Sequence, residues 1–206
     1  MDPENRRRVL DACAIRLSPG WVTHFGLMMV LSVTVAVMGL SANSPAVVIG
    51  AMLLAPLMTP VLGVAASLTM ALAAPLKRSL VVLFLATAGS IALSWFLSLF
   101  LRDGALPPEV LARTSPDARD LIVALAAGAA GAYATSRPDL SSSLPGVAVA
   151  VALVPPLAVV GMTLEVGRSD LARGAALLYV TNLTAIVVVG VLVFVLTGFA
   201  PPRRLA

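Results

Sequence analysis

The chain has 206 residues, of which 59% are hydrophobic and only 12% are charged. Soluble domains carry about a quarter charged residues, and the charges here avoid the long apolar blocks, so the sequence predicts an integral membrane protein. One His and one Cys exclude a disulfide within the chain and most metal clusters. Membrane orientation explains the net charge of +4 better than nucleic-acid binding does.

Residues 1–20 are polar and basic, and we expect them to form a cytoplasmic segment. Val9, Leu10, Cys13 and Leu17 fall roughly on one helical face, with the arginines elsewhere. This pattern fits a short amphipathic helix on an anionic membrane surface. It fits equally a tail whose arginines only set the topology.

Six apolar segments follow, and we expect each to cross the membrane. They cover about 21–40, 45–74, 79–101, 121–133, 145–164 and 174–197. Residues 102–120 are the predicted extracytoplasmic loop, and 198–206 the predicted cytoplasmic tail. With both termini in the cytoplasm, nine basic residues fall inside and five outside, as the positive-inside rule favours. If the interrupted segments were re-entrant instead, Lys77 and Arg78 would move outside.

The segment that begins at Asn43 is almost wholly apolar, yet it contains Pro45, Pro56 and Pro60. Proline removes a backbone donor and breaks a plain helix. In lipid, the freed groups must be met by neighbouring protein or by a water-lined cavity. The sequence therefore predicts a discontinuous transmembrane helix, with the other spans packed around it.

An internal repeat is indicated when the chain is compared with itself at a spacing of 100 residues. Pro45 then matches Pro145, Leu53 matches Leu153, and Pro56 matches Pro156. Residues 21–101 and 121–197 become two copies of a span, broken span, span unit. Because three crossings is an odd number, the second copy is inverted, as in secondary transporters. The alternative is that low-complexity apolar sequence aligns easily with itself.

Polar residues at the depth of the breaks are the candidate binding residues for a solute or ion. They are Ser32, Thr59, Ser90, Thr181, Asn182 and Thr184. The helix-break residues are Pro45, Pro56, Pro60, Pro145, Pro155 and Pro156, and they free the carbonyls of Met52 and Ala152. Asn182 is the preferred candidate because an amide is costly to bury unpaired. For the Ser and Thr side chains, the alternative is hydrogen bonding to their own backbone or between helices.

The run from Gly39 to Pro60 resembles the domain-of-unknown-function family 389, a family of bacterial and archaeal hydrophobic membrane proteins. The matching positions are Asn43 to Ala46, Ile49 to Leu53, and Pro56 to Pro60, and Pro155-Pro156 fits a later Val-Pro-Pro region. The resemblance implies a polytopic protein of the bacterial or archaeal cytoplasmic membrane. It implies no established activity.

These observations predict an all-α membrane protein with two inverted three-helix repeats. The leading hypothesis is a transporter or channel-like protein for a small neutral or weakly charged solute, or an ion. The alternative is a non-transporting scaffold or regulatory subunit. The spans contain no catalytic or metal-ligand set, so we expect neither an enzyme nor a cofactor. The expected partners are the lipid bilayer and further copies of the chain, with no nucleic acid.

Overall fold

The computed structural model describes residues 9, 11, 13, 15, 17–101, 106–137 and 153–199, and every regular element within them is a helix. The helices are α2 (Pro19–Ser41), α3 (Pro45–Leu54), α4 (Met58–Thr69), α5 (Ala73–Ser98), α6 (Pro108–Leu111), α7 (Ala118–Ser136), α8 (Val154–Glu165) and α9 (Ser169–Leu196). The predicted all-α class is thus confirmed for this part of the chain. Pro145 and Ala152 lie outside the described residues.

Three of these helices, α2, α5 and α9, are long and apolar enough to cross a membrane, with 23, 26 and 28 residues. At about 1.5 Å per residue, even the shortest exceeds the roughly 30 Å hydrocarbon core. The pair α3 and α4 also qualifies, but its two helices meet at 56°. The described residues therefore give three candidate spans, or four with the bent pair. The expected six crossings stay a prediction.

Local signals in the sequence place several helix starts. Ser18 accepts a hydrogen bond from the backbone N–H of Trp21 and precedes Pro19, which opens α2. Pro45 likewise opens α3. In these positions the missing proline N–H costs no hydrogen bond, because the first turn of a helix has no acceptors for its donors. A capping box between Asp117 and Asp120 starts α7.

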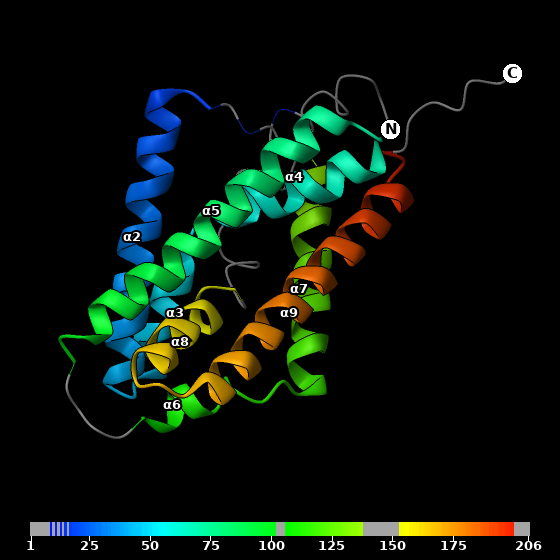
Figure 1. Ribbon diagram of the computed structural model, residues 1–206. Coiled ribbons are helices and arrows are strands. Elements are labelled where there is room, and N and C mark those ends of the chain that lie inside the picture. The colour runs from blue at the N-terminus through cyan, green and yellow to red at the C-terminus, as the bar shows by residue number, and fades with distance from the viewer. Residues whose placement is uncertain are drawn as a thin grey trace, which may run out of the picture.

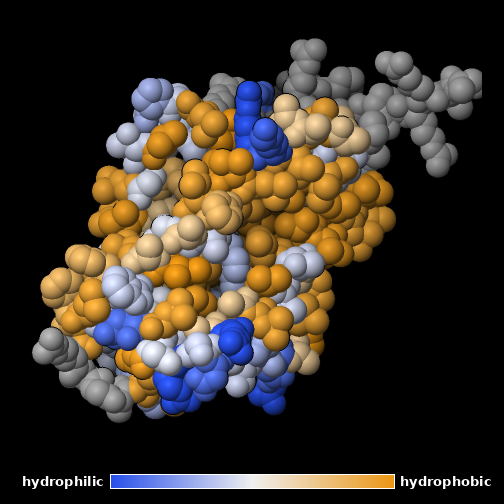
Figure 2. Space-filling view, in the orientation of Figure 1, coloured by the Kyte–Doolittle hydropathy of each residue, from blue (hydrophilic) through white to orange (hydrophobic). Residues whose placement is uncertain are grey.

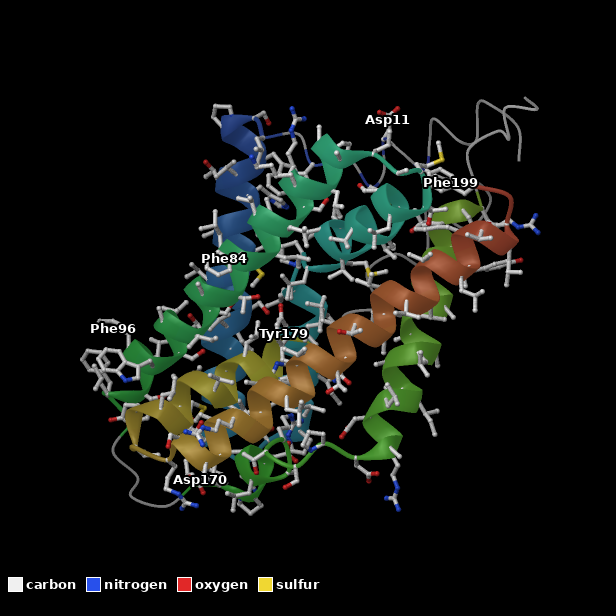
Figure 3. The ribbon with its side chains drawn as sticks, turned by 45° about the vertical axis from the view of Figure 1, so that its right-hand side comes forward. Asp11, Phe84, Phe96, Asp170, Tyr179 and Phe199 are labelled. Carbon is white, nitrogen blue, oxygen red and sulfur yellow. The ribbon has the colours of Figure 1, made fainter. Side chains whose placement is uncertain are left out.

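The start of α2 and the end of α9 lie at the same end of the molecule, whereas α6 lies at the opposite end (Figure 1). Figure 3 places Asp11 and Phe199 toward the first end and Asp170 toward the second. We call these the terminal end and the loop end. Figure 2 shows a broad hydrophobic band between hydrophilic groups at the two ends. This distribution suits a protein that sits in a membrane.

The interior of the bundle joins the two halves of the sequence. Helix α4 packs against α5 and α9, and α8 packs against α9 and α5. Close approach depends on glycine: a Cβ at Gly161 of α8 would lie 2.5 Å from the Ile91 carbonyl oxygen of α5. A Cβ at Gly190 of α9 would lie 3.1 Å from the Ala65 Cβ of α4. The contact of α8 with α5 and the contact of α4 with α9 both join the two halves of the sequence. Each thus contains a glycine on one partner.

The segment before α2 is anchored at the terminal end. Val9 and Cys13 are buried in a cluster with Leu62 of α4 and with Phe194 and Phe199 near the end of α9. The rings of Phe194 and Phe199 lie 5.2 Å apart between centroids. Burial raises the pKa of the Cys13 thiol to about 12. The only cysteine of the chain therefore stays protonated and unreactive near neutral pH.

Gly161→Ala tests the packing of α8 on α5. Its Cβ would overlap the α5 backbone, and overpacking of this kind costs about 1–3 kcal/mol. We expect the midpoint of thermal unfolding in detergent to fall by roughly 2–10 °C. The matched control is Gly50→Ala, because a Cβ at Gly50 meets nothing within 4 Å. An equal fall in both variants would contradict the described contact.

Candidate functional site

The chain leaves helical geometry between α3 and α4, around Pro56, and the interpretation of the pair as one broken transmembrane span stays a prediction. Helix α3 ends at Leu54, and the N–H of Ala55 reaches back to the Met52 carbonyl in a long bond of 3.4 Å. Pro56 has no N–H to continue the helix. The Met52 carbonyl, expected to be free, is thus only weakly engaged by the backbone.

The other prolines of this segment have different positions from those expected for breaks. Pro45 is the first residue of α3 and marks its start. Pro60 lies buried in the first turn of α4, where it interrupts no helical hydrogen bond. The interruption is therefore limited to residues 55–57, and the two helices on either side are regular.

Helix α8 begins inside the protein. Its second and third residues are Pro155 and Pro156, and both are buried. With 12 residues it is about 18 Å long, too short to cross a membrane alone. Within the described residues, these two prolines therefore mark a buried helix start. Pro145 falls outside the described part, so its role stays a prediction.

The two proline regions come together in space, but the space between them is narrow and apolar. A gap of about 10 Å³ separates them, which is the volume needed for about one water molecule. It is lined by Ala55, Leu57, Met58, Val61, Leu153, Val154 and Ile186. We call this the apolar gap. Residues 55–57 and the start of α8 thus lie on either side of this gap, and the side chains that line it are all apolar. The predicted meeting of two broken spans stays a prediction.

A larger, more polar cavity lies beside the apolar gap, on the side of the loop end. Its volume is about 340 Å³. Its walls are Met52 of α3, Pro155 and Pro156 of α8, Leu178 and Asn182 of α9, and Glu109, Ala112, Arg113, Asp120 and Val123 of α6, α7 and the turn between them. Asn182 stands midway along α9 and is only 3% exposed. We call this space the Asn182 cavity.

Helix α6 and the turn after it form the outer wall of the Asn182 cavity. One polar contact joins this wall to the turn after α2, and two further contacts lie within the wall itself. The Oδ1 of Asn43 accepts a hydrogen bond of 3.0 Å from the backbone N–H of Glu109. Arg113 donates to the carbonyl of Glu109 and forms an ion pair with its carboxylate. Asn43 adopts a positive φ of 51°, which asparagine tolerates better than most residues. The sequence predicts residues 102–120 only as a loop, so this wall was not expected.

The three predicted residues of α9 separate clearly. Asn182 lines the cavity, whereas Thr181 and Thr184 are exposed on the helix surface. The hydroxyl of Thr181 donates to the carbonyl of Leu177 in its own helix. In a bilayer, this face of α9 would meet lipid or another protein.

The other three predicted residues do not line the Asn182 cavity. Ser32 is fully buried, and its hydroxyl donates to the Ala51 carbonyl at 2.7 Å, joining α2 to α3. Ser90 is buried on the wall of a separate groove between α2 and α5. Thr59 is partly buried in the first turn of α4. Among the six polar candidates, only Asn182 is brought to the cavity.

Comparison with known proteins gives the family. A profile of a domain of unknown function (DUF389) matches residues 52–188, a range that contains both proline regions and Asn182. The chain belongs to the DUF389 family. An uncharacterised protein of Methanocaldococcus jannaschii is 32% identical over 177 residues, which cover 86% of this DUF389 protein and 55% of the relative. The chain thus spans about half the length of that curated relative. No solved structure matches this DUF389 protein.

Accessibility to water distinguishes the cavity side of α9 from its exposed side. In a Cys13→Ser background in proteoliposomes, we expect Asn182→Cys to react with a small, charged methanethiosulfonate reagent. Thr184→Cys should remain at least about tenfold slower, because a thiol facing lipid stays protonated and unreactive. Mass spectrometry of the labelled protein measures both rates. Faster labelling of Thr184→Cys would place water on the wrong side of the helix.

Proposed function

We propose that this DUF389 protein is a transporter or channel-like protein for a small neutral or weakly charged solute, or an ion, and that the Asn182 cavity is its binding site. The observation that carries the proposal is the position of the Asn182 amide. It lies midway along a 28-residue apolar helix, buried, on the wall of a cavity of about 340 Å³. A polar amide buried in an apolar helix is costly, and its place on a cavity wall favours a role in binding.

The charges around the cavity favour a neutral or weakly charged solute. Glu109 and Arg113 pair with each other, so their charges largely cancel. Asp120 is the remaining charged wall residue among those described, and its carboxylate accepts a bond from the backbone N–H of Asp117. No unpaired cation lines the described walls, which disfavours an anionic substrate. The side-chain amide of Asn182 contains both a donor and an acceptor, the kinds of group that recognise a polar solute.

The apolar gap supports a pathway that is closed on one side. Ile186 follows Asn182 by one turn of α9 toward the terminal end, and Val154 precedes Pro155 in the same direction. Apolar residues at a constriction of about one water diameter prevent permeation by dewetting. The structure would then represent a state in which solute enters the Asn182 cavity from the loop end and stops at the gap.

The contacts of α4 and α8 support the finer architecture of two inverted repeats. Helix α4 packs on α5 of its own half and on α9 of the other, and α8 packs on α9 and on α5 in the same way. Exchange of the two halves reproduces this pattern, as a two-fold axis in the membrane plane would require. In this proposal there are six crossings, both termini are cytoplasmic, and several copies assemble in the bacterial or archaeal cytoplasmic membrane.

Flux measurements in proteoliposomes test the function. We would measure stopped-flow swelling with urea and glycerol, and Na⁺ and K⁺ entry with ion-sensitive dyes. We expect flux of at least one probe, reduced about tenfold or more by Asn182→Leu because the polar contact is lost. Thr184→Val, two residues away on the exposed face, is the matched control and should keep the flux. Absence of flux for every probe, with folded protein, would contradict the proposal for these solute classes.

The alternative function is a membrane scaffold or regulatory subunit without transport. It is favoured by the apolar gap and by Ser32, whose hydrogen bond serves the protein's own packing. In that case the protein copurifies with a partner and flux is absent in the same assay. The Asn182 amide would then act only as a contact between helices.

A further inference from the structure

A second, strongly apolar groove opens between α2 and α5 and is separate from the Asn182 cavity. Its volume is about 400 Å³. One wall is α2, with Trp21, Phe25 and Gly26. The other wall is α5, with Val82, Leu85 and Gly89. Figure 1 shows the two helices diverging toward the terminal end. Gly26 and Gly89 have no atoms near a Cβ position, so the groove floor is open beside them.

Positive charges and aromatic rings lie near the terminal end of the groove, at the starts of α5 and α2. Lys77 and Arg78 are exposed in the first two turns of α5. Arg78 precedes Val82, Leu85 and Gly89 by 4, 7 and 11 residues, spacings that place it on the same helical face as the groove wall. On α2, Trp21 stacks on the neighbouring Phe25 with ring centroids 4.9 Å apart. Aromatic and basic side chains of this kind are typical of a membrane–water interface.

The length of the groove matches one leaflet of a bilayer. Along the helix axes the wall measures about 16 Å on α5, from Val82 to Leu93, and about 18 Å on α2, from Trp21 to Val33, against roughly 15 Å for half of the hydrocarbon core. A transmembrane helix of a second copy would need contact through the whole core. A lipid chain that ends at the middle of the bilayer fits this groove in both length and chemistry.

We propose that the α2–α5 groove binds an anionic phospholipid of the surrounding bilayer. One acyl chain lies along the groove between Trp21 and Gly89, and the phosphate headgroup lies at Lys77 and Arg78. The apolar walls take the chain, and the two cations attract the headgroup, each contributing about a fivefold preference near a membrane surface. The site requires only that α2 and α5 lie in a bilayer, so it is independent of the proposed transport function.

Fluorescence of Trp21 tests the site directly. The chain has two tryptophans, and Trp95→Phe leaves Trp21 as the only reporter. Proteoliposomes of phosphatidylcholine would contain a small fraction of brominated phosphatidylglycerol or brominated phosphatidylcholine. We expect the anionic lipid to quench Trp21 at a mole fraction at least fivefold lower. Lys77→Gln with Arg78→Gln should remove this preference.

Filling the groove separates a bound chain from a headgroup held only at the surface. Gly89→Leu places a side chain where the acyl chain would lie, and the open space there lets the protein accept it. We expect this variant to lose the preferential quenching, whereas Gly50→Leu, in a similarly open position on α3, keeps it. Equal quenching by both lipids, no quenching by either, or a preference that survives Gly89→Leu would each overturn the proposal.

Discussion

The backbone of a membrane protein must make its hydrogen bonds inside the protein, and this constraint governs the present structure. Pro56 cannot donate, so α3 stops and α4 starts in a new direction. Pro155 and Pro156 lie in the first turn of α8, where a missing N–H costs no helical hydrogen bond. Neither arrangement tolerates contact with lipid. Both lie near the place where α3, α4, α8 and α9 meet, with Pro155 and Pro156 buried and Pro56 half-buried.

Two neighbouring spaces, which differ in size and polarity, lie where these helices meet. The apolar gap separates the proline regions almost completely, whereas the Asn182 cavity extends from them toward the loop end. The amide at its wall stands near the middle of α9, a helix of mainly apolar residues. A binding site of this kind needs no formal charge, which agrees with the neutral or weakly charged solute of our proposal.

The sequence predicts features that depend on a single residue better than those that depend on orientation. The break at Pro56 follows from the missing proline N–H, and the burial of Asn182 follows from its place in an apolar helix. The different surroundings of Thr181 and Asn182 do not follow, because α9 is hydrophobic on all sides and its pattern reveals no inner face. The contact from Asn43 to Glu109 was also not predictable, since it joins a turn to a four-residue helix 66 positions away.

The central claim is that Met52 and Asn182 line one cavity beside the proline regions, and cross-linking measures this most directly. In a Cys13→Ser background, Met52→Cys with Asn182→Cys should be joined by a short bifunctional methanethiosulfonate, as a mass increase of the intact chain would show. Leu53→Cys with Asn182→Cys is the comparison, because Leu53 is exposed and does not line the cavity. Efficient joining of the Met52 pair alone is the predicted result. Joining of the Leu53 pair, with none for Met52, would contradict the account.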